Sequence, residues 1–379
     1  MIKCVDNLNM ELTNACNFSC RFCASPVMSR KKGLMDTALA KHLISEARKS
    51  GFCRNVTTNV MGEPLLHKGL FEIVEHAHTV GQRLTVITNG ERLDADTAEK
   101  LIAAKPFEVA ISFHADSDAS FAARGAAISY SAYKNQVFQL LDVKYRLRSP
   151  TRISVQVMTS VTRPASAVKL LAGDDDIREF GKEWLSFARE MKKKHALSWQ
   201  VPPRIFVGAN GLLPGFYLAL YDSYHTWSNS ILPPGTAVKK GVCCHCTAPF
   251  TQCNVLWNGD MTLCCIDYDG ELVFENVKDK PLVETFNSLQ ARALRARFID
   301  GKGVPEKCLL CWGSLEPVAA AASGCQKAAG YRLAPAEQAA KAYYRTAAII
   351  GNGEVLDFLS AKLRTWSTAR KMRSRSLEP

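Results

Sequence analysis

The amino-acid sequence predicts an α/β fold: a partial (β/α)6 barrel, followed by a small C-terminal domain of β-hairpins and helices and then by terminal helices. Two features lead to this expectation. Between residues 6 and 208, short β-rich runs alternate with runs of helical periodicity. Beyond that part the texture changes to a strong hairpin turn at Asn258-Gly259 and to closely spaced cysteines.

The alternating part contains a series of expected strands, each followed by a loop and most by a helix. The strands are expected at 8–13, 55–60, 83–90, 107–113, 152–158 and 203–209. The helices are expected at 36–50, 68–79, 95–104, 131–146 and 174–194, the first with Asp36 as its N-cap. This order predicts right-handed crossovers and a parallel sheet with too few units to close an eight-stranded barrel. Functional residues are then expected at the carboxyl ends of the strands.

The chain divides into four segments by composition. Residues 1–210 form the partial barrel, and 211–242, rich in Gly, Pro and aromatic residues, is a connecting and substrate-facing segment. Residues 243–325 form the cysteine-rich domain, and 326–379 contain C-terminal helices and a basic tail. The tail contributes much of the net charge of +12, and no nucleic-acid motif accompanies it, so we expect a solvated tail and no nucleic-acid partner.

The location of the protein is expected to be cytoplasmic. The N-terminus has no apolar region of the kind found in signal peptides, and the sequence has no run of about eighteen apolar residues that could span a membrane. Disulfide frameworks are typical of short secreted chains, whereas this chain has 379 residues and 14 cysteines. The cysteines therefore indicate metal or redox chemistry.

Three cysteines lie close together near the N-terminus, at Cys16, Cys20 and Cys23. Cysteine thiolates are the usual ligands of iron–sulfur clusters, and three of them can hold three corners of a four-iron cluster. The fourth iron then remains open to a small molecule. A structural zinc site normally has a closed set of four ligands, and no fourth ligand lies nearby in the sequence.

The stretch ELTNACNFSCRFC (residues 11–23) resembles the signature of the radical S-adenosylmethionine (radical SAM) superfamily. Later stretches resemble the other motifs of that superfamily in the same order. They are MGEP (61–64), with Met61 in place of the first glycine of the family's Gly-Gly-Glu loop, ITNG (87–90) and AISFHAD (110–116). The resemblance covers about residues 8–210 and implies reductive cleavage of SAM to a 5′-deoxyadenosyl radical. His114 departs from the pattern, because many relatives have an acidic residue at this position.

The resemblance also implies roles for individual residues in binding SAM. Glu63 would accept the SAM ammonium group, Ser112 would bind polar groups of SAM, and Arg124 would pair with its carboxylate. Phe22 would lie beside the adenine. The residues implied for SAM binding are Phe22, Gly62, Glu63, Asn89, Ser112 and Arg124.

A second group of four cysteines resembles the auxiliary-cluster domain of the SPASM/Twitch group of radical SAM enzymes. Its members are Cys246, Cys264, Cys308 and Cys311, which together would ligate one auxiliary [4Fe–4S] cluster in the shorter, Twitch-like form. Three alternatives stay open: Cys265 in place of Cys264, a Cys₄ zinc ribbon, and a second auxiliary cluster. The last would use Cys243, Cys244, Cys253 and Cys325.

The leading hypothesis for the reaction is oxidation or epimerisation of a hydroxylated small molecule, such as a sugar, cyclitol or nucleotide sugar. The alternative is a maturase that crosslinks or epimerises a ribosomally made peptide, and a non-catalytic Fe–S or zinc binding module is a third. An external donor of the flavodoxin or ferredoxin type would supply electrons. Candidates for a base or hydrogen donor are Cys253, Cys265, Tyr221 and His225, with Tyr217, Tyr224 and His245 in the same region.

Overall fold

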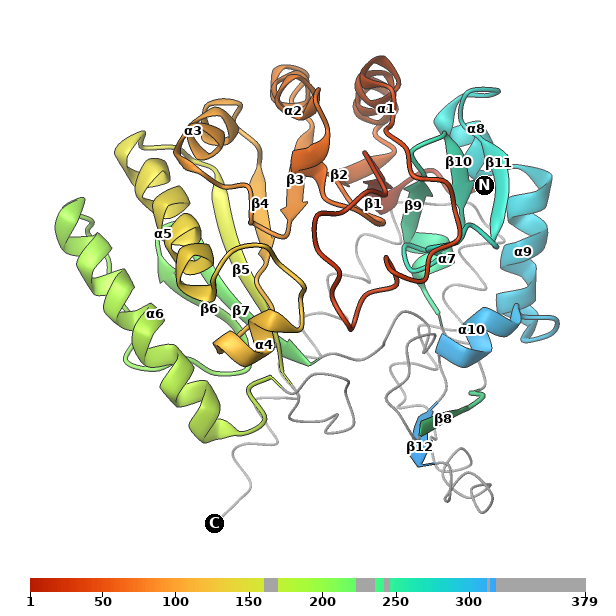
Figure 1. Cartoon of the computed structure of the whole chain (residues 1–379). Coiled ribbons are helices and arrows are strands. Elements are labelled where there is room, and N and C mark those ends of the chain that lie inside the picture. Colours follow the sequence, from red (N-terminus) through yellow and green to blue (C-terminus); the bar gives the residue numbers. More distant parts are fainter. Residues whose placement is uncertain (160–169, 223–235, 242–245, 312–313, 318–379) are drawn as a thin grey trace, which may run out of the picture.

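The computed structural model describes residues 1–159, 170–222, 236–241, 246–311 and 314–317 (Figure 1). The expected segment 326–379 lies outside these residues. Within them the dominant element is one sheet of ten strands in the order β11-β10-β9-β1-β2-β3-β4-β5-β7-β6. It is not closed into a barrel, because its two edge strands, β11 and β6, are not paired with each other. The expected partial barrel is confirmed.

Seven neighbouring strands of the sheet are parallel, from β9 through β1 to β5 and β7. We call residues 1–222 the first half of the described chain and residues 236–317 the second half. The strands of the first half are β1 (Val5–Met10), β2 (Cys53–Thr57), β3 (Arg83–Thr88), β4 (Glu108–Ser112), β5 (Arg152–Thr159), β6 (Gly208–Leu213) and β7 (Phe216–Asp222). Those of the second half are β9 (Gln252–Val255), β10 (Asp260–Thr262) and β11 (Val273–Asn276). A separate antiparallel pair consists of β8 (Thr236–Lys239) and β12 (Ser314–Pro317).

Helices line the outer side of the curved sheet in an arc (Figure 1). The helices of the first half are α1 (Thr37–Ser50), α2 (Leu70–Thr79), α3 (Ala95–Ala103), α4 (Asp118–Ala122), α5 (Tyr130–Arg146) and α6 (Asp174–Lys194). Those of the second half are α7 (Ala248–Thr251), α8 (Leu282–Phe286), α9 (Leu289–Asp300) and α10 (Glu306–Cys311). Asp36 caps α1 as expected, since its carboxylate accepts from the backbone N–H of Leu39 at 3.0 Å. None of the helices in the described part of the chain is long and apolar enough to span a membrane.

The sixth parallel strand lies later in the chain than the sequence pattern predicts. The run 203–207 is not a strand, and Phe206 and Val207 are 55% and 43% exposed. The chain instead forms β6, turns at Gly215 with φ +69°, and returns as β7, which pairs in parallel with β5. The apolar residues of 203–209 fit a strand, but Phe206 and Val207 face solvent and only Ile205 is buried, so the prediction was wrong about this element.

The cysteine-rich half of the chain continues the same sheet. Strand β9 pairs in parallel with β1, and the expected hairpin at Asn258-Gly259 joins β9 to β10. Gly259 has φ +95°, a conformation that favours glycine in such turns. The second half therefore begins directly beside the strand that leads into the first cysteine loop.

Candidate active site and auxiliary cluster site

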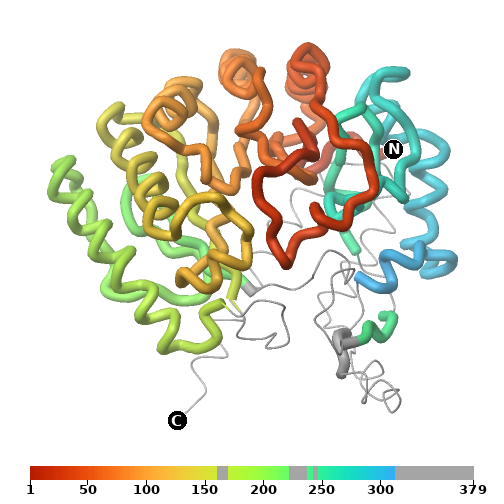
Figure 2. Tube along the Cα trace, in the orientation of Figure 1, coloured from red at the N-terminus to blue at the C-terminus, as the bar shows by residue number. Residues whose placement is uncertain are grey.

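The loop of residues 11–36, which follows β1, carries Cys16, Cys20 and Cys23 at the carboxyl end of the parallel strands. Figure 2 shows this loop in red at the centre of the arc, between the strands of the first half and the teal segment of the second half. On one side the backbone N–H groups of Ser19 and Arg21 donate to the carbonyls of Arg124 and Ala123, both at 3.0 Å. The loop is thus held against the segment that follows β4.

Gly62 and Glu63 hold the start of the same loop. The Glu63 N–H donates to the Ala15 carbonyl at 2.8 Å. Gly62 has φ +83°, and a Cβ at this position would lie 2.1 Å from the carbonyl oxygen of Thr13. Glycine is therefore required here both by conformation and by the close approach of two backbones.

N–H groups donate to two of the three sulfur atoms of the loop, those of Cys16 and Cys23. The Phe18 N–H donates to Cys16 Sγ at 3.4 Å, and the Ser25 N–H donates to Cys23 Sγ at 3.5 Å. The Asn89 side-chain amide reaches Cys16 Sγ at 3.8 Å. Such donors stabilise negative charge on sulfur, as required of a thiolate that ligates a cluster.

Burial raises the pKa of the Cys16 thiol, and it raises the pKa of Cys23 to about 12. These thiols are therefore protonated in the metal-free protein, and cluster binding has to release their protons. No group of three or more His, Cys, Asp or Glu side chains in the described ranges is placed to hold one metal ion. A four-iron cluster does not require its ligands to converge on one ion, because each thiolate binds a different iron. The donor-rich cysteine loop fits such a group.

Glu63 lies at the base of the loop and is 1% exposed. One carboxylate oxygen accepts from the Thr88 hydroxyl at 2.6 Å and from the Leu65 N–H at 2.9 Å. The other accepts from the Asn89 N–H at 2.6 Å. Two carboxylate oxygens offer roughly four acceptor sites, so about one remains for a ligand donor such as an ammonium group. Burial raises the pKa of Glu63 to about 6.

Arg124 lies beside the cluster loop inside the core, and it is 2% exposed. Its guanidinium donates to the Phe113 carbonyl and to the Tyr133 hydroxyl, and its Cζ lies 4.7 Å from the centroid of the Phe18 ring. Its Nε is buried and has no hydrogen-bond partner among the described residues. Its side chain also interacts with the Cys20 thiol. The positive charge of Arg124 thus lies next to a predicted cluster ligand.

A row of aromatic rings lies at the carboxyl ends of β4 and β7. The Phe22 and His114 ring centroids are 6.1 Å apart, and those of His114 and Tyr221 are 5.8 Å apart. The Tyr221 hydroxyl lies 3.3 Å from His114 Nε2. Ser112 is the last residue of β4 and lies two positions before His114 in the sequence. Its side chain is half-buried. Phe22 and Tyr221, predicted separately, are thus connected through His114.

The remaining candidates for the reaction are placed elsewhere. Cys253 on β9 is fully buried, with Sγ 3.9 Å from Met261 Sδ, and burial raises its pKa well above the ordinary value. A thiol packed in this way is not accessible to a substrate. The structure therefore does not support Cys253 as a hydrogen donor. Tyr217 lies on β7, where the Arg152 guanidinium covers its ring. Outside the described residues lie His225, Tyr224, His245, Cys243, Cys244 and Cys325.

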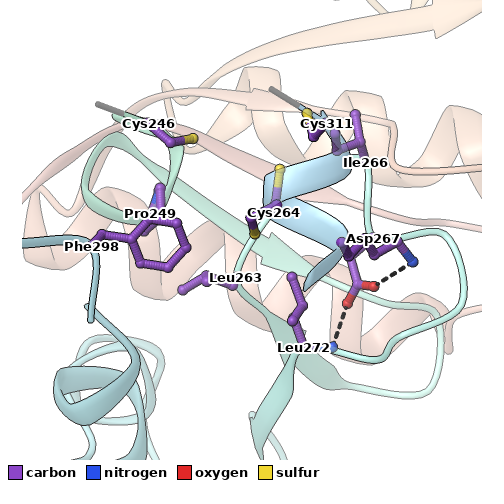
Figure 3. A pocket seen from close by; sticks show the side chains of 11 residues that line it. Cys246, Pro249, Leu263, Cys264, Ile266, Asp267, Leu272, Phe298 and Cys311 are labelled. Atoms are coloured by element: carbon purple, nitrogen blue, oxygen red, sulfur yellow. Dashed lines mark hydrogen bonds and ion pairs between the residues drawn. The ribbon is translucent and has the colours of Figure 1, made fainter. Parts of the chain in front are cut away.

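The four cysteines predicted for the auxiliary cluster line one cavity (Figure 3). They are Cys246, Cys264, Cys308 and Cys311. The cavity has an empty volume of about 360 Å³, part of it open to solvent. The other lining residues are mostly apolar, as suits a buried cluster. Residues from three separate stretches of the chain thus converge, and the donor set fits a fully ligated [4Fe–4S] cluster.

Cys265 lies among the same thiols. Its side-chain contact with Cys264 holds the pKa of Cys265 below its ordinary value, and the nearby Cys246 and Cys311 thiols oppose this effect. The cavity, however, is lined by Cys264. The choice between these two neighbours as the fourth ligand therefore remains a prediction, and Cys265 belongs to the auxiliary site rather than to the mouth of the barrel.

Hydrogen bonds link the first cysteine loop to the second half of the chain, and a buried ion pair within the loop holds two of the residues that make them. Arg30 binds Glu11 through two contacts, at 2.9 Å and 2.6 Å, and its Nε donates to the Tyr268 carbonyl at 2.6 Å. Glu11 is fully buried and also accepts from the Trp257 N–H at 3.2 Å. The Ser29 N–H donates to Asp269 at 2.7 Å. These contacts fix the two predicted cluster sites relative to each other.

Comparison with known families agrees with this arrangement. Residues 10–146 match the model of the radical SAM superfamily. The chain thus contains a radical SAM domain. Residues 244–312 match the SPASM model, described as an iron–sulfur cluster-binding domain. The cofactors are therefore SAM with a [4Fe–4S] cluster and auxiliary iron–sulfur ligation, as expected from the sequence.

Curated relatives match shorter stretches of this radical SAM protein. An AdoMet-dependent heme synthase from Methanosarcina barkeri is 27% identical over 165 residues, which is 42% of this chain and 46% of the relative. A PqqA peptide cyclase from Xanthomonas euvesicatoria is 32% identical over 130 residues, 34% of each chain. Mycofactocin maturase MftC from Mycobacterium ulcerans is 34% identical over 123 residues, 31% of this chain and 32% of the relative. The matches span less than half the length of these relatives.

A solved structure of similar fold is that of BtrN in complex with AdoMet and 2-DOIA. It is 16% identical, with a TM-score of 0.50, and the match covers 81% of this chain and 93% of that chain. At this level of identity the similarity supports the fold of the radical SAM protein and nothing finer.

Proposed function

We propose that this radical SAM protein matures a ribosomally made peptide by crosslinking or epimerising it. The observation that carries the proposal is the pairing of a three-cysteine loop with a four-cysteine cavity, the two connected by hydrogen bonds from Arg30 to the Tyr268 carbonyl and from the Trp257 N–H to Glu11. Among the curated relatives, one is named a peptide cyclase and another a maturase. They support the peptide alternative better than oxidation or epimerisation of a small molecule, the function favoured by the sequence.

The bound cluster with SAM would supply a 5′-deoxyadenosyl radical that abstracts a hydrogen from the substrate. The residues of the chain bind and orient the reactants. Cys16, Cys20 and Cys23 would hold the cluster, and the N–H donors beside the Cys16 and Cys23 sulfurs stabilise these two thiolates. Glu63 has about one acceptor site left for the SAM ammonium group, and its position is fixed by three hydrogen bonds.

The four cysteines of the second site would hold a cluster without an open coordination position. When bound, such a cluster would supply an acceptor for the electron that a substrate radical must lose when an oxidative crosslink forms. Arg30 and Glu11 serve this transfer by fixing the distance between the two sites, because Arg30 contacts both the end of β1 and the carbonyl of Tyr268. An external electron donor of the flavodoxin or ferredoxin type would reduce the first cluster.

Tyr221 is the residue that we propose to face the substrate, with His114 as the group that positions it. Strand β5 extends beyond its last pairing with β4 at Gln156, and the Met158 N–H donates to His114 Nδ1 at 3.3 Å. The hydrogen of the neutral imidazole then lies on Nε2 and is donated to the Tyr221 hydroxyl at 3.3 Å. Burial lowers the pKa of His114 to about 3, so the ring stays neutral at physiological pH.

The backbone at His114 supports a functional role for this residue. Its φ is +37°, which is uncommon outside glycine and clusters at functional sites. The imidazole is 8% exposed and lies between the Phe22 and Tyr221 rings. In this conformation Nδ1 accepts from the Met158 N–H of strand β5, and Nε2 lies beside the Tyr221 hydroxyl.

The proposed function is tested by substrate-dependent SAM cleavage. The reconstituted protein is incubated anaerobically with SAM, a reductant and short peptides encoded near its gene, and a second series contains hydroxylated metabolites. A peptide that increases 5′-deoxyadenosine and returns with two hydrogens fewer, or with an inverted residue, supports the proposal. Stimulation by metabolites alone would replace it with the small-molecule function.

A further inference from the structure

Lys307 lies at the cavity of the auxiliary cysteines, next to Cys308 in sequence. Its Nζ is 3.2 Å from Asp267 Oδ1 and 3.1 Å from Glu271 Oε1. The same Nζ lies 4.3 Å from the centroid of the Tyr268 ring. Its side chain is 9% exposed, so the ammonium group is held in one place beside the cavity.

Asp267 connects Lys307 to another part of the site. It is fully buried and accepts from the backbone N–H of Glu271 at 3.1 Å. It also accepts from the backbone N–H of Leu272 at 2.9 Å (Figure 3). Its own N–H donates to the Cys264 carbonyl at 3.1 Å. The Asp267–Lys307 ion pair therefore joins the loop after Cys264 to helix α10. This helix carries Cys308 and Cys311, two of the four predicted cluster ligands.

The charge of Lys307 has a direct consequence for a cluster in this cavity. Among the described lining residues, Lys307 is the one cation, and Asp267 is the one carboxylate. A cluster with four thiolate ligands is anionic, and reduction adds one more negative charge. A nearby cation in a poorly hydrated site stabilises the reduced form more than the oxidised form, which raises the reduction potential.

We propose that Lys307 sets the reduction potential of the auxiliary cluster, and that Asp267 and Glu271 position its ammonium group. The inference rests on the proposed function, because it assumes that the four cysteines ligate a cluster. Lys307 favours uptake of an electron by the cluster, whereas its removal leaves the Asp267 carboxylate beside the cavity without a cation to balance its charge.

The test uses the full chain with the substitutions C16A, C20A and C23A, so that a cluster can form only at the auxiliary site. Its midpoint potential is measured by a redox titration followed by EPR. K307M is expected to lower the potential, and K307R, which keeps the charge, is expected to stay close to the parent. K280M is the matched control, because Lys280 forms a more exposed ion pair with Glu275.

A normal iron content in K307M with an unchanged potential would overturn the inference. If K307M loses its iron, E271Q decides, because Glu271 is 58% exposed and removing its charge is expected to raise the potential. An unchanged potential in E271Q would then overturn the inference as well. Failure of the proposed function gives a different result: SAM cleavage stimulated by metabolites alone would replace the peptide substrate and leave the potentials of the parent and K307M unchanged.

Discussion

The substitution G62A tests how the Gly-Glu loop supports the first cysteine loop. Alanine at φ +83° costs about 1–2 kcal/mol relative to glycine. Its Cβ would also lie 2.1 Å from the Thr13 carbonyl oxygen and 2.8 Å from that of Ala15. Both are backbone atoms of the cysteine loop, so the strain cannot be relieved by a side-chain rotation. Displacing packed atoms adds about 1–3 kcal/mol, for a total destabilisation of about 2–5 kcal/mol.

Gly51 provides a matched control. It has φ +64° at the end of α1, and a Cβ there would meet nothing within 4 Å. G51A therefore has the conformational cost of about 1–2 kcal/mol without the clash. The assays are urea unfolding of the apoprotein and iron binding at the first site in a variant lacking the auxiliary cysteines. We expect G62A to lose more stability than G51A and to bind less iron. Equal losses in the two variants would refute the reasoning.

Three further experiments test the connection between the sites, the SAM site and the substrate face. R30A is expected to lower the free energy of unfolding by about 3–5 kcal/mol, because it leaves the Glu11 carboxylate buried without its cation; a loss below 1 kcal/mol in urea unfolding would contradict this. Because the pKa of Glu63 is raised to about 6, SAM affinity measured by calorimetry should fall as the pH drops below that value, and a variant E63Q with the same pH dependence would exclude Glu63 as the cause. H114N keeps an acceptor and tolerates the left-handed backbone, but its side chain is too short to reach Tyr221. It should therefore lower the yield of product per 5′-deoxyadenosine as Y221F does, with no further loss in the double variant; additive losses would show that the two residues act separately.

The sequence predicted the first cysteine loop and its supporting motifs because both depend on local signals. Asp36 marks the start of α1, and the Gly-Glu motif needs a backbone conformation that glycine favours. The four auxiliary cysteines were also identified, and the structure places them around one cavity.

Long-range pairing left no comparable signal in the sequence. Strand β9 pairs with β1 across about 245 residues of chain. The expected strand at 203–209 was wrong because apolar letters do not reveal which face is covered. The true sixth parallel strand, β7, carries Tyr221, and its segment was assigned to a connection because of its Gly and Pro content.

Individual partners were missed for the same reason. Lys307 and Asp267 are 40 residues apart, and Arg30 reaches Tyr268 over 238 residues. Charged side chains are common at surfaces, so their types alone did not separate these buried pairs from solvated ones. The position of His114 in the left-handed region has no signature in its neighbours either.

The iron content of the reconstituted protein tests the central claim most directly. Two four-iron clusters predict about eight irons per chain, and about four in the C16A/C20A/C23A variant. That variant should also form no 5′-deoxyadenosine from SAM, since the open cluster site is lost. The account would be contradicted by a wild-type protein with about four or about twelve irons, or by SAM cleavage that persists without these three cysteines.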